Sequence, residues 1–434
     1  MHRIFTTCIF LFGLAPIILL MAAENTGINR SSELRWMGHW KAEGLREQLV
    51  LEVLEDFRYL NQDINVKFAF SSDILPEKSH DQQARFIVDM IQSGTISWDV
   101  IWLDSGVYQS VAKLLDDPFW GEKYLVDFSN AGTIRDAHRP ELLNSPGFCQ
   151  STGGILTGPY IEGFLYCLWY NTETAKRLGL TIPKEEMSFD NLLEYLQRVN
   201  EFNLTSNEQI CAIVSFKKSG SFSRLAHNLL LSADPDTETR KAQLDVLKAL
   251  EQIRVLHATV DDPENLSWPD AARMLTDDKA LFLIESTWRY SSFEQFSSDL
   301  AHKMKPAQMP GFQKQNFYCG GFIPTWAVMK GSPAREAAVQ LMEFWCKPEV
   351  IEKWTRYTKN PSGIIGSLYD PEYGNDPIAI YQRKLVKGRT LHPDFFMQPE
   401  RSPSMQSILK FILPVITGET TAEDVMKELD NPAP

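Results

Sequence analysis

The side chains that most often carry out catalysis are present in this chain, but not in the spacings that known catalytic sites use. The sequence has 56 acidic residues and 8 histidines. It contains no G-x-x-x-x-G-K-[ST] phosphate loop, no G-x-G-x-x-G turn after a strand, no H-E-x-x-H metal motif and no G-x-S-x-G nucleophile elbow. A carboxylate pair for glycoside hydrolysis is not excluded, because a sequence does not give the separation of two carboxyl groups. These patterns favour a binding protein over an enzyme, and they predict neither a metal nor an organic cofactor.

Length and charge narrow the class further. A chain of 434 residues is long enough for two or three domains. Lys and Arg total 43 against 56 Asp and Glu, which gives a formal net charge of −13. Binding to nucleic acid or to an anionic membrane surface needs clusters of basic side chains, and the sequence has none. We therefore expect a neutral or cationic small molecule as the partner, and no nucleic acid.

The first 23 residues have the layout of a secretory signal peptide. A short basic start with Arg3 precedes an apolar run over residues 4–21, and Ala22 and Ala23 supply small residues for cleavage. The alternative is an uncleaved membrane anchor, because the run is nearly long enough to span a bilayer. The pattern predicts a mature protein that starts near Glu24 and works in the periplasm.

The cysteines outside that segment are odd in number and widely spaced. They are Cys149, Cys167, Cys211, Cys319 and Cys346. An odd count leaves at least one thiol unpaired, and the wide spacing differs from that of zinc ligands. We expect buried free thiols, with one structural disulfide as the alternative.

Hydrophobic periodicity predicts an α/β fold. Apolar residues at helical spacing over 44–60 and 81–93 alternate with strand patterns over 33–40, 64–70 and 98–103. Strand, helix, strand, helix, strand over about 70 residues is typical of a parallel sheet with helices on its faces. A further aromatic strand is predicted over 164–170.

Four later stretches, in this order, resemble the extracellular solute-binding proteins of ABC importers, specifically the large sugar-binding type related to maltodextrin-binding protein. They are G-P-Y-I-E-G-F-L-Y with W-Y-N-T-E over 158–173, I-E-S-T-W within 280–289, G-G-F-I-P-T-W-A-V over 320–328 and K-N-P-S-G over 359–363. Their order and spacing extend the resemblance over residues 30–430.

The resemblance implies the two-lobed periplasmic-binding-protein fold of type II. Each lobe would be a mostly parallel sheet flanked by helices, and a hinge between the lobes would let them close on the ligand. It assigns residues 24–160 and 285–330 to the first lobe, and residues 161–284 and 331–434 to the second. It also implies a monomer that delivers a solute to the membrane permease of an ABC transporter.

The resemblance and the chemistry of sugars together suggest which residues bind the ligand. Aromatic rings can cover the apolar C–H face of a sugar, while carboxylates and amides bind its hydroxyls. The candidate rings are Trp40, Tyr160, Trp288 and Trp326. The candidate polar residues are Asp104, Ser105, Glu162, Glu285 and Asn360. Trp40 and Asp104 each follow a predicted strand, where ligands of open α/β sheets bind.

Each candidate also has a purely structural explanation. The alternative for the tryptophans is the hydrophobic core. Asp104 could serve as the cap of a helix that starts at Ser105, and Glu162 could form a salt bridge between the lobes. The alternative functions are capture of a non-sugar solute such as a polyamine, for which aromatic rings and carboxylates are equally suitable, and a secreted carbohydrate-active enzyme.

Overall fold

The computed structural model describes residues 33–41, 43–75, 79–138, 154–183, 186–215, 220–233, 238–260, 265–323, 326–366, 377–395 and 402–431. The predicted signal peptide, residues 1–23, and Cys149 lie outside these ranges. Within the described ranges, no helix is long and apolar enough to cross a membrane. The four described cysteines, Cys167, Cys211, Cys319 and Cys346, all have free thiols, and all but Cys211 are buried.

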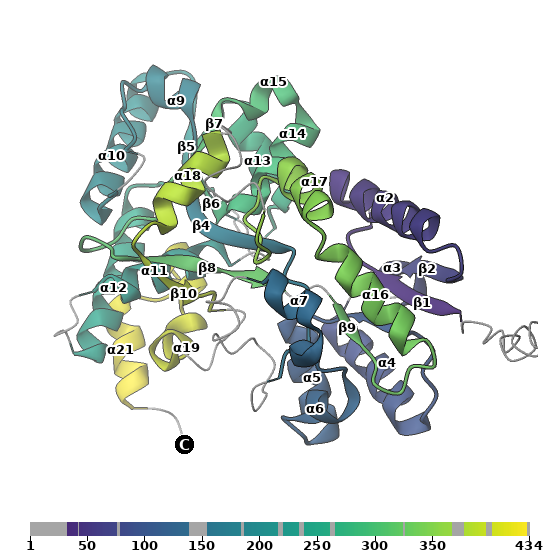
Figure 1. Cartoon of the computed structure of the whole chain (residues 1–434). Coiled ribbons are helices and arrows are strands. Elements are labelled where there is room, and N and C mark those ends of the chain that lie inside the picture. Colours follow the sequence, from purple (N-terminus) through teal and green to yellow (C-terminus); the bar gives the residue numbers. More distant parts are fainter. Residues whose placement is uncertain are drawn as a thin grey trace, which may run out of the picture.

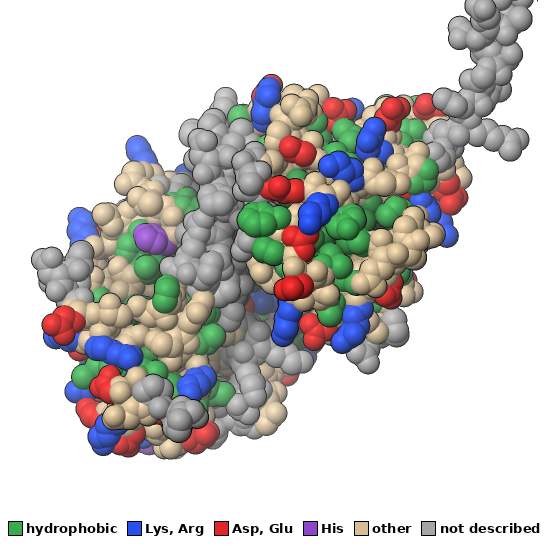
Figure 2. Space-filling view, turned by 90° about the horizontal axis from the view of Figure 1, so that it is seen from below, with side chains coloured by type: hydrophobic (Ala, Val, Ile, Leu, Met, Phe, Trp, Pro, Cys, Tyr) green, Lys and Arg blue, Asp and Glu red, His purple; other side chains and the backbone are tan. Residues whose placement is uncertain are grey.

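The chain forms two bodies, each built on its own β-sheet (Figure 1 and Figure 2). The first sheet has the order β2 (Val66–Phe70), β1 (Leu34–Gly38), β3 (Val100–Trp102) and β9 (Trp326–Val328). Its first three strands are parallel, and β9 runs antiparallel to β3. We call the body on this sheet the first lobe.

The second lobe is built on a six-stranded sheet. Its order is β10 (Thr390–Pro393), β8 (Phe317–Ile323), β4 (Glu162–Asn171), β6 (Ala280–Ser286) and β5 (Cys211–Val214), and β7 (Met304–Ala307) also pairs with β4. The long strand β4 is antiparallel to β6, β7 and β8, whereas β10 is parallel to β8 and β5 is parallel to β6, so this sheet is mixed. The two-lobed α/β fold is thus confirmed, but the expectation of a mostly parallel sheet holds only for the first lobe.

Helices cover both faces of the first sheet, because its strands carry apolar side chains on both sides. Trp36 and Trp102 face one core with α2 (Leu45–Leu60), α16 (Arg335–Trp345) and α17 (Pro348–Thr358). Met37 and Ile101 face a second core with α4 (His80–Ser93) and α5 (Ser105–Leu115). The shorter elements of this lobe are α3 (Ser71–Ile74), α6 (Trp120–Tyr124), η1 (Phe128–Asn130) and α7 (Gly132–Ala137).

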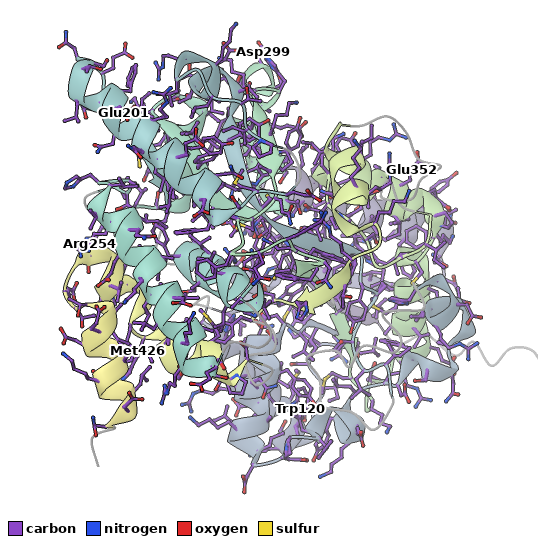
Figure 3. All side chains as sticks on the ribbon, turned by 90° about the vertical axis from the view of Figure 1, so that its left-hand side faces the viewer. Trp120, Glu201, Arg254, Asp299, Glu352 and Met426 are labelled. Atoms are coloured by element: carbon purple, nitrogen blue, oxygen red, sulfur yellow. The ribbon has the colours of Figure 1, made fainter. Side chains whose placement is uncertain are left out.

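The second lobe has the larger core. All ten residues of β4 are buried, with alternate side chains on opposite faces of the sheet. Figure 3 views the lobe from its helical side, where Arg254 of α12 and Met426 of α21 are labelled. The helical elements are α9 (Thr172–Arg177), α10 (Phe189–Thr205), α11 (Ser221–Leu231), α12 (Thr239–Val255), α13 (Trp268–Thr276), η3 (Thr287–Arg289), α14 (Tyr290–Phe296), α15 (Ser298–Ala301), α18 (Pro377–Val386), α19 (Pro403–Leu409), α20 (Ile412–Thr417) and α21 (Ala422–Asp430).

The segments that join the lobes lie side by side. The backbone N–H of Gly158 donates to the carbonyl of Trp326 (2.9 Å), and that of Gly363 donates to the carbonyl of Tyr160 (2.9 Å). Just beyond, Gly163 donates to the carbonyl of Pro361. Several backbone contacts therefore tie the crossings together.

Packing groups two segments differently from the expected lobe boundaries. Residues 287–323 pack with the second sheet, because β7 and β8 both pair with β4. Helices α16 and α17 pack with the first sheet, where Trp345 and Trp354 join the core around Trp36. The sequence had placed these segments in the opposite lobes.

Candidate functional site

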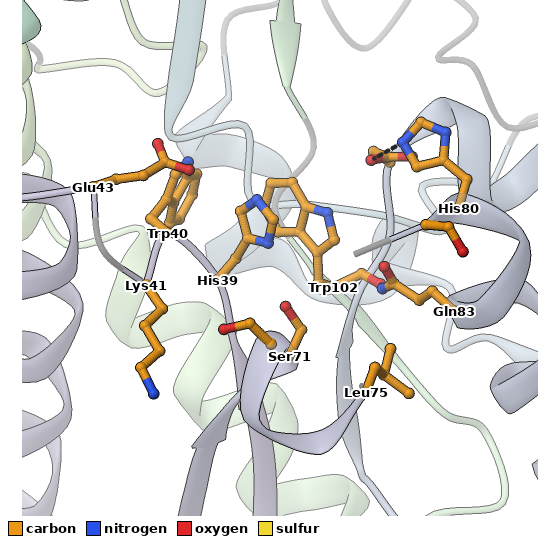
Figure 4. Close-up of a pocket in the computed structure, with 12 residues that line it drawn as sticks. His39, Trp40, Lys41, Glu43, Ser71, Leu75, His80, Gln83 and Trp102 are labelled. Atoms are coloured by element: carbon orange, nitrogen blue, oxygen red, sulfur yellow. Dashed lines mark hydrogen bonds and ion pairs between the residues drawn. The ribbon is translucent and has the colours of Figure 1, made fainter. Parts of the chain in front are cut away.

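A pocket lies where the three parallel strands of the first sheet end (Figure 4). Its volume is about 160 Å³. Parallel strands place their carboxyl ends at the same edge of a sheet, which is where ligands of open α/β sheets bind. The lining comes from the segments after β1, β2 and β3 and from the start of α4, and consists of His39, Trp40, Lys41, Glu43, Ser71, Ser72, Leu75, Ser79, His80, Gln83, Trp102 and Asp104.

Stacked rings form one wall of this pocket. The imidazole of His39 lies flat against the indole of Trp102, with ring centroids 3.8 Å apart and planes within 3°. Trp40 meets Trp102 edge to face at 5.0 Å. The Trp102 carbonyl accepts a hydrogen bond from Gln83 Nε2 (2.6 Å), which fixes the start of α4 against β3. Because Trp40 and Trp102 are nearly buried, half-buried His39 is the most exposed ring of the wall.

The Lys, Glu and Asp side chains that line the pocket each pair with another side chain of the protein. Lys41 pairs with Asp73, and Glu43 pairs with Arg46 (3.4 Å). Asp104 pairs with His80 Nε2 at 3.3 Å.

The pKa values of the last pair shift in opposite directions. Burial alone would raise the pKa of Asp104, but the hydrogen bond with His80 and the helix N–H of Val107 outweigh it and lower this pKa. The hydrogen bond with Asp104 raises the pKa of His80. The charged side chains of the pocket therefore all have partners, but Glu43 and Glu162 share Arg46, and His80 carries a positive charge only when protonated.

Two of the sequence-predicted residues line this pocket. Trp40 adopts a left-handed backbone conformation (φ 68°) directly after β1, which turns its ring toward Trp102. Asp104 faces the pocket and also caps α5, where its Oδ1 accepts a hydrogen bond from the N–H of Val107 (2.9 Å). Ser105 is the first residue of α5 and is not part of the lining.

Glu162 and Asn360 meet in the buried crossing between the lobes. Asn360 Nδ2 donates to Glu162 Oε1 (2.8 Å), and Arg46 Nε donates to Glu162 Oε2 (3.2 Å). Glu162 is 1% exposed and Asn360 is 2% exposed. Arg46 belongs to α2 in the first lobe, and Glu162 begins β4 in the second. Arg46 and Glu162 therefore form a salt bridge between the lobes, which was the structural alternative for Glu162.

Tyr160 lies in the same crossing. Its backbone N–H donates to His138 Nε2 (3.1 Å), and its half-buried ring meets that of His138 edge to face at 5.5 Å.

Glu285 and Trp288 lie together at the end of β6 in the second lobe. The indole N–H of Trp288 donates to Glu285 Oε1 (3.2 Å), and Arg224 and Arg289 pair with the same carboxylate. Trp288 is half-buried, whereas Glu285 is only 1% exposed.

Trp326 is a residue of the hydrophobic core, which was its structural alternative. It is 0% exposed and lies in the core of the first lobe, edge to face with Trp36 at 5.5 Å and 4.7 Å from Trp345. It therefore offers no surface to a ligand.

Direct contacts join the Trp288 segment to the loop that lines the pocket. Gln295 of α14 donates from Nε2 to the carbonyl of Glu43 (3.2 Å). A side chain on neighbouring Gly44 would meet the Gln295 amide at 2.1 Å, so the lobes are in tight contact here. Arg46 also acts electrostatically on Arg289. Burial lowers the pKa of Arg289, and the like charge of Arg46 lowers it further.

Sequence reasoning did not identify several residues of the site. His39, Ser71 and Ser72 directly follow β1 and β2, so the strand-end rule that selected Trp40 and Asp104 could also have selected them. Nothing in the sequence places Arg224 beside Glu285, because the two are 61 residues apart. Within the described residues, no group of His, Cys, Asp and Glu side chains is arranged to hold a metal ion.

The fold is that of several solved solute-binding proteins. The maltose-bound MalE3 protein of T. maritima has a TM-score of 0.68 at 15% identity, over 92% of this chain and 98% of that one. The GacH receptor of Streptomyces glaucescens, solved unliganded and with acarbose, gives 0.69 at 14% identity over 92% and 97%. A solute-binding protein of Thermotoga lettingae, solved with α-D-tagatose, gives 0.66 at 17% identity over 91% and 96%.

The assignment to a protein family rests on the sequence and not on the fold. No curated protein matches this chain significantly. The model of the bacterial extracellular solute-binding proteins matches residues 74–379, which is more than half of the chain. The match includes α4, the second sheet apart from β10, and the helices that complete the first lobe. The chain therefore belongs to the family of bacterial extracellular solute-binding proteins.

Proposed function

We propose that this protein binds a neutral sugar or oligosaccharide between its lobes and delivers it to the permease of an ABC transporter. It would work in the periplasm, as a monomer, after cleavage of residues 1–23. The lobe-one pocket would hold one side of the sugar, and Trp288 of the second lobe would cover the other. The observation that carries the proposal is a ring-walled pocket whose charges are paired within the protein.

Charge pairing favours a neutral ligand over a cation. A polyamine gains most from a carboxylate that lacks a counter-ion. Both carboxylates of the pocket already have a partner, because Glu43 shares Arg46 with Glu162 and Asp104 pairs with His80, which carries a positive charge when protonated. A cationic ligand would have to compete with these pairs, whereas sugar hydroxyls can add hydrogen bonds to them without displacing a charge.

The other lining groups are suited to hydroxyls and to a C–H face. Ser71 and Gln83 supply donors and acceptors, and the His39 and Trp102 rings supply a flat wall. The solved proteins of this fold provide independent support, because those named above were solved with maltose, acarbose and tagatose.

A ligand screen tests the proposal. We expect a saccharide among maltose, raffinose, chitin and xylan oligosaccharides to raise the melting temperature, because a ligand of the folded state stabilises it by about 4 kcal/mol at a thousandfold excess over Kd. The Kd should change little with NaCl concentration. A polyamine hit whose affinity falls steeply with salt would show that the ligand is a cation. Formation of a sugar product during incubation would establish an enzyme instead.

A further inference from the structure

Glu285 is a buried carboxylate that accepts hydrogen bonds on both of its oxygens. Oε1 accepts from the backbone N–H of Ser286 (2.9 Å), the hydroxyl of Ser286 (3.0 Å) and the indole N–H of Trp288 (3.2 Å). Oε2 accepts from Arg289 Nη2 (3.1 Å). The side chain is therefore saturated by the protein, and with almost no exposed surface it does not reach a ligand.

Two arginines keep this carboxylate ionised. Arg224 Nη1 lies 2.9 Å from Oε1, and Arg289 Nη2 lies on Oε2. Burial alone would raise the pKa of Glu285, but the two guanidinium groups outweigh it and hold the pKa below its usual value. An ionised carboxylate can only accept hydrogen bonds, and those to charged groups are stronger than neutral ones. Glu285 is thus a firm acceptor for the Trp288 indole.

Trp288 is the member of this cluster with exposed surface and an aromatic face. Phe164 packs against its ring with centroids 4.6 Å apart, and the Arg224 guanidinium lies 5.8 Å from the ring centroid. Together with the indole N–H bond to Glu285, these contacts hold the ring from its edge and its surface. The orientation of the ring therefore depends on the position of a carboxylate three residues earlier.

The position of this ring along the chain connects it to the pocket. Trp288 lies in η3, which continues directly into α14. Gln295 of α14 donates to the carbonyl of Glu43, and Glu43 lines the pocket of the first lobe. The segment that carries Trp288 is thus one part of the second lobe that contacts the pocket-lining loop.

We propose that Glu285 is a positioning residue: it holds the Trp288 indole in the orientation in which the ring covers the apolar face of the bound saccharide, and it touches no ligand itself. This inference rests on the proposed function and adds to it the residue that presets one wall of the site. A ring that is fixed before binding lowers the entropy cost of ordering it when the sugar arrives.

A double-mutant cycle tests the inference. The proteins are the full wild-type chain, Glu285→Asp, Trp288→Phe and the double variant, each titrated calorimetrically with maltose, raffinose and chitin oligosaccharides. Glu285→Asp keeps the negative charge between Arg224 and Arg289 but withdraws the carboxylate by one methylene. We expect it to weaken affinity about tenfold in the wild type, and to have no further effect with Trp288→Phe, because phenylalanine lacks the N–H.

Ser286→Ala is the matched control. It removes another donor from the same carboxylate oxygen and leaves the indole bond in place, so affinity should stay within about twofold of the wild type. If Ser286→Ala weakens binding as much as Glu285→Asp, or if the two substitutions of the cycle act additively, Glu285 is not a positioning residue. A wild-type protein that binds none of these saccharides contradicts the proposed function itself.

A second readout does not need a ligand. The fluorescence difference between the wild type and Trp288→Phe isolates the emission of Trp288, and the same difference can be measured with Glu285→Asp present. We expect the emission to shift to longer wavelength when the indole loses its buried partner and gains contact with water. An unchanged emission spectrum would overturn the inference whatever the binding data show. Far-ultraviolet circular dichroism confirms that each variant is folded.

Discussion

At the scale of single residues, the site consists of charges that are paired before any ligand arrives. The pair of His80 and Asp104 is the most accessible example, because the imidazole is largely exposed and lies 3.3 Å from the carboxylate. Pairing at such a distance lets each group stabilise the charged form of the other. The pocket is therefore sensitive to pH.

The His80 and Asp104 pair predicts a dependence of stability on pH. The raised pKa of His80 contributes stability that is fully present below the pKa of an unfolded histidine, about 6.5, and is lost as the pH rises through the folded value. The lowered pKa of Asp104 contributes stability that is present above about 3.8 and is lost as the pH falls through its folded value. The pair should therefore stabilise the fold most between about pH 4 and pH 6.5.

Urea unfolding at pH 5.5 and pH 8 measures this contribution. We expect His80→Asn to remove part of the stability at pH 5.5 and little at pH 8. The difference should be under about 1 kcal/mol, because the imidazole is largely exposed and water screens the pair. His302→Asn, at an exposed position just after α15, is the control. An equal loss at both pH values would contradict the prediction.

At the scale of elements, the loop between β1 and α2 connects the ligand pocket to the second lobe. Trp40 and Glu43 line the pocket, Gly44 contacts Gln295, and Arg46 pairs with Glu162 at the start of β4. This loop and the first turn of α2 thus together contact the pocket, the hinge strand and α14. Its backbone takes positive φ angles at Trp40 (68°) and Gly44 (58°).

Gly44→Ala should weaken ligand binding as well as stability. The backbone of Gly44 (φ 58°, ψ −115°) lies outside the left-handed helical region, so any side chain costs about 1–3 kcal/mol, and the new methyl group would displace the Gln295 amide from the Glu43 carbonyl. Gly94→Ala is a control for a positive φ angle without a contact, because Gly94 (φ 67°, ψ 10°) follows α4 and has open space around it. We expect both variants to lose stability in urea unfolding, Gly44→Ala more than Gly94→Ala, and only Gly44→Ala to lose calorimetric affinity. Equal affinities would show that the contact with Gln295 does not matter for binding.

Patterns within one element predict far more of this molecule than contacts between elements. The helical spacing over 81–93 and its terminal Gly94 correspond to α4, and the aromatic run over 164–170 lies within β4. The lobe to which a segment belongs was not predictable in this way, because β8 and α16 find their neighbours through pairings more than 100 residues away.

The same limit applies to the candidate site. The strand-end rule selected Trp40 and Asp104, and both side chains line the pocket. Trp326 has the same kind of local sequence, but its ring packs against Trp36 and Trp345 in the core. Glu162 resembles a ligand residue in the sequence because its partner Arg46 is 116 residues away.

At the scale of the whole molecule, a buried ion pair joins the two lobes close to the hinge. Arg46 belongs to the first lobe, and Glu162 begins the central strand of the second. Removing one member of a buried pair leaves a charge without its partner, which typically costs about 3 kcal/mol or more. Asn360 remains as a neutral donor to Glu162 and limits this loss.

Arg46→Met should therefore lower the free energy of unfolding by about 3 kcal/mol. With Glu162→Gln also present, the Arg46 substitution should cost clearly less, because no buried carboxylate is then left without its counter-ion. Urea unfolding of the wild type, the two single variants and the double variant measures the coupling. If the single effects simply add, the pair does not couple the lobes energetically.

The buried thiols allow the transient opening of each lobe to be measured separately. Burial raises the pKa of Cys346 to about 12, and it raises those of Cys167 and Cys319 strongly as well. A thiol-reactive reagent can therefore label these side chains only during transient opening events. Cys346 lies in the core of the first lobe, whereas Cys167 and Cys319 lie in the second. Labelling rates therefore report the opening of each lobe separately. A ligand that bridges the lobes should slow the labelling of the thiols in both lobes.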